Sequence, residues 1–202
     1  MIKILRSSLV VATVFGIGLI ANKTFADQTI QGTSATVEVN GTLGADNTNP
    51  DSKIPEGDNN WINVTVPTST IFYNTPTVST VKSPQYSIIN NSGRPVNVST
   101  TSFTADGANV APSDFNLILK FVGTETNAAT NATTNLVTAG AVNSSLSSQL
   151  ITLANKDGKL TSTGTATAGD NKATFTYGGS SSTTTMIQLK YNLGLTFKSV
   201  EW

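Results

Sequence analysis

The sequence predicts an all-β protein, an antiparallel β-sandwich of the Ig-like or jelly-roll-like type. Short runs of Val, Ile, Thr, Tyr and Phe alternate with polar residues, which is the pattern of half-buried strands. Turn dipeptides separate these runs, including Asn-Gly at 40–41, Asp-Gly at 106–107 and Gly-Gly at 178–179. Amphipathic helical periodicity is scarce, and short strands at this spacing are typical of sandwiches and barrels.

The first 26 residues have the pattern of a secretory signal peptide. Lys3 and Arg6 precede a nearly unbroken apolar run over 9–21, and the small residue Ala26 precedes polar Asp27. The run is too short to span a bilayer, which needs roughly 20 apolar residues. We therefore expect cleavage after Ala26, export, and no membrane insertion of the mature chain, residues 27–202.

The mature chain is predicted to be a single β-sandwich domain. Two polar segments interrupt its strands and are expected to be long loops, at 44–60 and 123–141. Near 144–154, apolar residues approach helical spacing, so one short helix is expected there. The expected strands are residues 33–43, 61–66, 71–73, 85–90, 96–103, 115–122, 158–167, 171–177 and 185–197.

The stretch "SPQYSIINNSGRPVNVSTTSFT", residues 83–104, has the appearance of a hairpin. Two alternating runs flank a turn in which Asn90, Asn91 and Gly93 tolerate positive φ. Pro95 removes an N–H donor at the start of the second run, where an unpaired position costs least. We expect this pair of strands to be part of the scaffold.

The composition favours binding over catalysis. The chain contains no His and no Cys, which excludes Ser-His-Asp triads, Cys-His dyads and histidine-based zinc sites. Paired carboxylates would suit a glycosidase, but few tryptophans are present to grip a sugar. Lys and Arg balance Asp and Glu at 12 each, and three of the bases lie before residue 27. A mildly acidic mature chain does not indicate nucleic-acid binding.

The first polar loop is a candidate calcium site. Asp46, Asn49, Asp51 and Asp58 supply the hard oxygen ligands that calcium prefers. The spacing does not match an EF-hand, and Asp and Asn also favour turns in a solvated connector. Calcium is therefore the one cofactor that the sequence raises, and a plain connector is the alternative.

Four aromatic residues are candidate binding residues: Trp61, Tyr73, Tyr86 and Trp202. They would form a binding platform if they faced one side of the sandwich. The alternative is that they lie in the core or pair across strands, as strand aromatics usually do.

Lys120 and Lys190 each lie inside an apolar run. One interpretation is that either lysine forms an intramolecular isopeptide bond with an asparagine. The default interpretation is that both lie on the solvent side of an alternating strand.

Three segments carry a family resemblance: the early "SATVEVNGTL", the central "INVTVPTSTIFYNTPTVSTVKSPQYSIINNSGRPVNVSTTSF" and the closing "KYNLGLTF". Together they resemble divergent WxL-type cell-surface proteins of low-GC Gram-positive bacteria and the small secreted proteins related to them. This resemblance implies a β-rich fold, export, and non-covalent attachment to peptidoglycan. The absence of cysteine is consistent with an exported Gram-positive protein.

The sequence thus predicts a secreted, non-catalytic surface protein located at the cell surface or cell wall. It would bind peptidoglycan, a host or matrix component, or a surface protein partner. The alternative is a structural subunit of a surface polymer assembled by strand exchange, with "DQTIQGTSATVEV", residues 27–39, as the candidate donor.

Overall fold

The computed structural model describes residues 43–108, 110–124 and 131–202. The helical structure in this part of the chain is one turn of 3-10 helix, η1 (Asn59–Trp61), and no helix in it is long and apolar enough to cross a membrane. The strands are β1 (Val64–Thr65), β2 (Tyr73–Thr75), β3 (Val78–Lys82), β4 (Tyr86–Asn90), β5 (Val96–Ala105), β6 (Asn116–Val122), β7 (Asn131–Thr138), β8 (Ala141–Val142), β9 (Ser148–Leu153), β10 (Lys172–Ser180) and β11 (Tyr191–Ser199).

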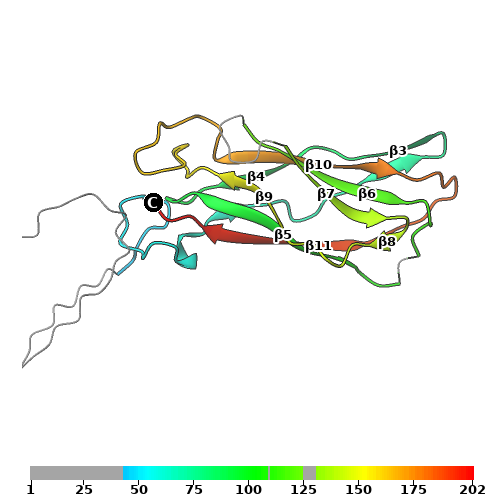
Figure 1. Cartoon of the computed structure of the whole chain (residues 1–202), viewed down its shortest axis with the longest axis horizontal. Coiled ribbons are helices and arrows are strands. Elements are labelled where there is room, and N and C mark those ends of the chain that lie inside the picture. The colour runs from blue at the N-terminus through cyan, green and yellow to red at the C-terminus, as the bar shows by residue number, and fades with distance from the viewer. Residues whose placement is uncertain (1–42, 109, 125–130) are drawn as a thin grey trace, which may run out of the picture. The chain divides into compact units, whose positions relative to one another are not determined.

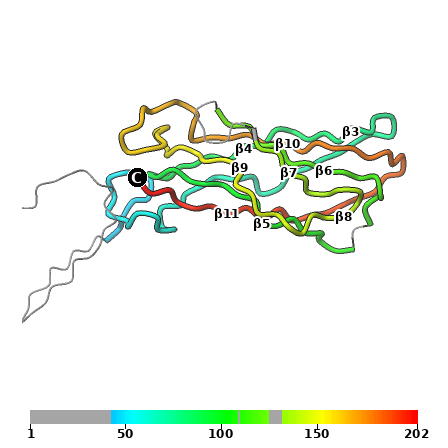
Figure 2. Tube along the Cα trace, viewed as in Figure 1, coloured from blue at the N-terminus to red at the C-terminus, as the bar shows by residue number. Residues whose placement is uncertain are grey.

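These strands form two antiparallel sheets (Figures 1 and 2). The larger sheet has the order β1-β4-β10-β6-β7-β8, and β3 extends it by pairing with the far end of β10 and with β2. The smaller sheet has the order β11-β5-β9. The predicted all-β, antiparallel, sandwich-like fold is therefore confirmed.

One apolar core joins the two sheets. In β6, Leu117, Leu119 and Phe121 are buried while the residues between them are not, as the period of two in a strand requires. Val98 of β5 and Ile151 of β9 belong to the same cluster, which places the core between the sheets. Alternation in the sequence thus selects the face that each strand buries.

The predicted hairpin over 83–104 is wrong in its pairing. Its two strands are β4 and β5, but β4 pairs with β1 and β10, whereas β5 pairs with β9 and β11. The turn between them crosses from one sheet to the other. Its residues do not adopt positive φ, and Gly93 is required because an added Cβ would lie 2.8 Å from the backbone carbon of Asn49.

The helix predicted near 144–154 is also wrong, because this segment contains strand β9. Residues 150–153 are buried in succession, and β5 supplies their backbone partners through a ladder with an irregularity between Val98 and Ser99. The irregularity shifts the pairing register within β9, so consecutive residues can be buried in a strand. The apolar spacing that looked helical is therefore compatible with β9. Tertiary pairing therefore overrides the local pattern.

Four further segments differ from expectation. The expected strand 158–167 consists of turns, and the expected loop 123–141 contains β7, whose Leu136 and Val137 are buried. Strand β3 and the late start of β11 at Tyr191 were not predicted. Residues 33–42 and 125–130 lie outside the described residues.

Candidate binding groove

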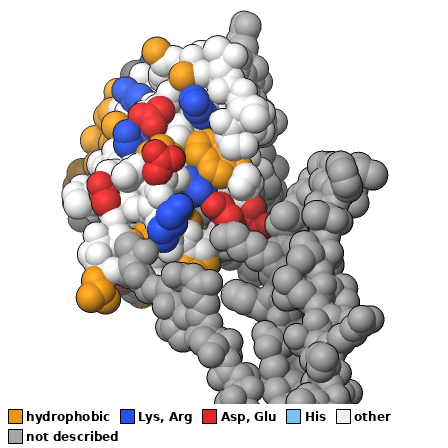
Figure 3. Space-filling view, turned by 90° about the vertical axis from the view of Figure 1, so that its left-hand side faces the viewer, with side chains coloured by type: hydrophobic (Ala, Val, Ile, Leu, Met, Phe, Trp, Pro, Cys, Tyr) orange, Lys and Arg blue, Asp and Glu red, His pale blue; other side chains and the backbone are white. Residues whose placement is uncertain are grey.

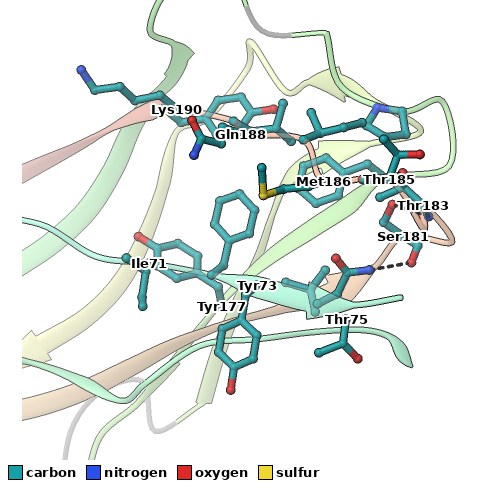
Figure 4. A pocket seen from close by; sticks show the side chains of 18 of the residues that line it. Ile71, Tyr73, Thr75, Tyr177, Ser181, Thr183, Thr185, Met186, Gln188 and Lys190 are labelled. Carbon is teal, nitrogen blue, oxygen red and sulfur yellow. Dashed lines mark hydrogen bonds between the residues drawn. The ribbon is translucent and has the colours of Figure 1, made fainter. Parts of the chain in front are cut away.

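A large open groove lies at the end of the sandwich where β10 finishes. It is bounded by residues 70–76 on one side and 181–191 on the other, and its volume is about 1070 Å³. Figure 4 shows Ile71, Tyr73 and Thr75 on the first side and Met186 and Gln188 on the second, with the Tyr73 and Thr75 side chains pointing away from the second side. A cavity of this size corresponds to the upper range of ligand sites.

The floor of the groove is aromatic. The ring of Phe72 stacks on Phe115 at a centroid distance of 5.7 Å and lies 6.2 Å from Tyr177 and 6.4 Å from Tyr191. Tyr177 belongs to the larger sheet and Tyr191 to the smaller one. Phe72 therefore fills the end of the sandwich between the two sheets.

Two tyrosine hydroxyls hold the first side in place. The backbone N–H of Ile71 donates to the Tyr86 hydroxyl at 2.7 Å, and the Thr70 hydroxyl lies 3.0 Å from the Tyr177 hydroxyl. Both tyrosines project from strands of the larger sheet. The first side is thus positioned by the rigid sheet, although residues 66–72 belong to no strand.

The second side is fixed where it leaves β10. Gly179 has φ +133°, and the N–H of Ser181 donates to the carbonyl oxygen of Ser79. The N–H of Ser182 donates to Asp114 Oδ2 at 2.5 Å. The hydroxyl of Ser182 and then its N–H lower the pKa of the Asp114 carboxyl below its ordinary value.

Apolar side chains around the groove are exposed to solvent. The exposed fractions are 61% for Ile71, 86% for Met186 and 43% for Ile187, and half of Tyr73 is exposed. Exposed apolar side chains that gather around one hollow are typical of interaction surfaces. These side chains therefore make this groove the strongest binding candidate in the described chain.

The groove offers little charge. Its charged lining residues, Asp106 and Lys190, form an ion pair at 2.6 Å. Burial raises the pKa of both Tyr177 and Tyr191, so both hydroxyls stay neutral at ordinary pH. The Tyr191 hydroxyl is buried without a hydrogen-bond partner among the described residues. The groove is suited to apolar and neutral polar groups.

The candidate aromatic residues do not form one platform. Tyr73 lines the groove, and Tyr86 is a positioning residue beside it. Trp61 is fully buried, which agrees with the alternative that strand aromatics lie in the core, and a role for it in binding stays a prediction. Trp202 lies at the other end of the sandwich, where the Arg94 guanidinium is 4.7 Å from its ring and 4.2 Å from that of Trp61.

Arg94 joins the first polar loop to the C-terminal residues. Its Nε and Nη2 donate to Glu56 at 2.8 and 2.5 Å, and its Nη1 donates to the carbonyl oxygen of Pro50 at 2.7 Å. Asn90 supports the same turn by donating to the carbonyl oxygens of Arg94 and Ala154, both at 2.8 Å. Figure 3 looks onto this end and shows basic and acidic side chains interspersed on it. The turn over 90–94 is thus a buried polar connection.

The oxygen ligands proposed for calcium form local turns. Asp46 Oδ1 accepts from the N–H of Thr48 at 2.9 Å, Asn49 Oδ1 from that of Asp51, and Asp58 Oδ1 from that of Asn60. The Thr48 N–H lowers the pKa of Asp46. Among the described residues, no three acidic side chains gather as a metal site. Calcium binding by this loop stays a prediction.

Both lysines of the apolar runs are at the surface. Lys120 is exposed on β6, and Lys190 forms the exposed pair with Asp106. This placement agrees with the default interpretation, in which each lysine faces solvent.

Sequence reasoning missed Met186 and Ile187, because the expected strand 185–197 would have paired them in a sheet. The local sequence "TTTMIQL" contains no signal that distinguishes this exposed segment from a buried strand.

Comparison of the chain with protein-family models, curated proteins and solved structures gives no match. The fold and the groove define the class: an all-β, sandwich-like protein with an open, weakly charged groove at one end.

Proposed function

We propose that the protein is a secreted, non-catalytic surface protein that uses this groove to bind an apolar segment of a protein partner. The observation that carries the proposal is the presence of three exposed apolar side chains, Ile71, Met186 and Ile187, around a groove with an aromatic floor. Such a surface gains free energy when a partner covers it.

A protein segment fits the groove better than a polar glycan does. The charged lining residues already pair with each other, and the sides are apolar or carry hydroxyl and amide groups. A partner that presents apolar side chains and backbone amides would match both features. Export and location at the cell surface are parts of the same proposal and depend on the signal-peptide pattern over residues 1–26.

NMR titration of the mature chain tests the binding proposal with two probes. The first is a short peptide of alternating valine and threonine, and the second is a soluble peptidoglycan fragment. We expect the peptide to shift resonances of Ile71, Met186 and Ile187, and the fragment to leave them unchanged. The proposal is overturned if the peptide shifts none of them, or if the fragment alone does.

A matched pair of variants locates the binding site. Ile187 and Val122 are exposed to a similar extent, 43% and 47%, but only Ile187 lines the groove. Ile187→Glu should abolish the peptide-induced shifts, whereas Val122→Glu should retain them. Equal loss in both variants would show that the peptide binds without using the groove.

Attachment to the cell wall is a separate arm of the proposal. The resemblance to WxL-type proteins predicts that the mature chain sediments with purified peptidoglycan sacculi. The experiment should be run with and without calcium, because the loop over 44–60 is the candidate metal site. Absence of sedimentation under both conditions would remove wall attachment and leave the groove proposal standing.

A further inference from the structure

The groove has features of a site for an added strand. Residues 186–189 make no backbone hydrogen bonds within the described chain, and three of these four residues are exposed. On the opposite side, β2 pairs only with β3 among the described strands. Rows of free N–H and C=O groups are what an incoming extended segment pairs with.

The side chains specify the kind of segment. Phe72, Tyr177 and Met186 already supply large groups to the groove. A matching strand would therefore present small, β-branched apolar residues on one face. It would present polar residues on the other face, toward solvent.

Such a segment precedes the first described residue of this same chain. In residues 27–42, "DQTIQGTSATVEVNGT", an extended conformation would put Ala35, Val37 and Val39 on one face and Glu38 and Asn40 on the other. The face is small, apolar and β-branched in part, as the groove requires.

The described chain starts at the end of the sandwich opposite the groove (Figure 1). The carbonyl oxygen of Asn47 accepts from Gly93 at 2.7 Å, beside the start of β10, whereas the groove includes Ser181, just after β10 ends. The nine residues of β10 separate the two ends by roughly 30 Å. A segment that leaves one end of a copy is therefore well placed to enter the groove of the next.

We propose that the groove accepts residues 27–42 of a second copy as an added strand, so that copies join head to tail. The inference rests on the proposed function and names the partner as the chain itself. A contact in which the segment of each copy enters the groove of the next is heterologous and builds open chains.

Sedimentation velocity of the mature chain, residues 27–202, over a range of concentrations tests the inference. We expect species larger than a monomer that increase with concentration. Ile187→Glu in the groove, or Val37→Glu together with Val39→Glu in the segment, should each weaken association by about tenfold or more, because each buries a charge. Val122→Glu should associate like the wild type.

Mixing the two defective variants gives a sharper result. The groove variant keeps an intact segment and the segment variant keeps an intact groove, so the mixture should form a heterodimer and nothing larger. Wild-type protein that stays monomeric at every concentration overturns the inference, as does a mixture that stays monomeric or association that neither variant weakens.

The failure of this inference can be distinguished from failure of the proposed function. If the valine-threonine peptide shifts the groove resonances while the wild type stays monomeric, the groove binds another protein partner. If the peptide fails as well, the proposed function fails with the inference.

Discussion

Replacing Arg94 with alanine should strongly destabilise the end of the sandwich that carries Trp202. Arg94 is 6% exposed, and its guanidinium donates to the Glu56 carboxylate and to the carbonyl oxygens of Pro50 and Gly93. It also lies between the rings of Trp61 and Trp202. Removing it takes these donors away from the Glu56 carboxylate and from the carbonyl oxygens of Pro50 and Gly93.

The magnitude follows from these contacts. Breaking a buried ion pair by removing one partner costs about 3–5 kcal/mol. Glu56 is partly open, with 30% of its side chain exposed, so water recovers part of that loss. Loss of the two cation-π contacts adds to it. We expect the free energy of unfolding to fall by about 3 kcal/mol, or the Tm by roughly 6–12 °C for a chain of this length.

Two controls separate charge from geometry. Arg94→Lys keeps the charge but loses the paired donation to Glu56, so it should cost less, about 1–2 kcal/mol. Glu56→Gln keeps the shape of the acceptor and removes its charge. In a double-mutant cycle, Arg94 and Glu56 should be coupled by about 1 kcal/mol or more.

Urea denaturation followed by tryptophan fluorescence is the appropriate assay, because both tryptophans contact Arg94. A loss below about 1 kcal/mol for Arg94→Ala would refute this reasoning, since that is the range of surface pairs. An Arg94→Lys variant as unstable as the alanine variant would show that geometry matters more than charge.

The remaining predictions concern single residues near the groove. Ser182 lowers the pKa of Asp114, so the ionised carboxyl stabilises the loop fully at pH values above its unfolded pKa near 3.8. This contribution to stability is lost as the pH falls through the lower pKa of the folded state. An NMR titration midpoint at or above 3.8 would contradict this prediction. Gly179→Ala would place a Cβ 2.0 Å from the Asn116 carbonyl oxygen at φ +133°, so thermal denaturation should show a loss of about 2–3 kcal/mol, and a neutral result would argue against this backbone geometry. Tyr191→Phe removes a buried hydroxyl without a partner among the described residues and should raise the free energy of unfolding by about 1 kcal/mol; a loss of stability would indicate a bridging water.

The fold class could be predicted from the sequence because strand alternation is a local property. The runs at 96–103 and 115–122 agree with β5 and β6, since each strand buries alternate side chains. Pairing could not be predicted, because it depends on contacts distant in sequence. The turn at 90–94 has the composition of a hairpin, yet Arg94 and Asn90 form bonds to Glu56 and Ala154 that direct the two strands into different sheets.

The candidate site was predictable only in part. Tyr73, one of the candidate binding residues, lines the groove, but aromatic character alone could not separate it from buried Trp61. Met186 and Ile187 are exposed because residues 181–190 run without a partner strand among those described. An apolar run by itself predicts a buried strand. Whether the segment actually pairs with a neighbouring strand depends on the whole sheet, which the local sequence does not describe.

Strand β11 follows its partner strand β5 by many residues in the sequence, which delays folding of the smaller sheet. Ladder partners in β11 and β5 lie up to about a hundred residues apart, and Trp202 reaches Arg94, which also holds the loop over 44–60. The smaller sheet therefore lacks one of its strands until β11 has been synthesised. Long-range pairing of this kind makes folding slow. If the chain is exported as proposed, this delay would help keep it unfolded during passage through the membrane, with the sandwich forming only on the outside.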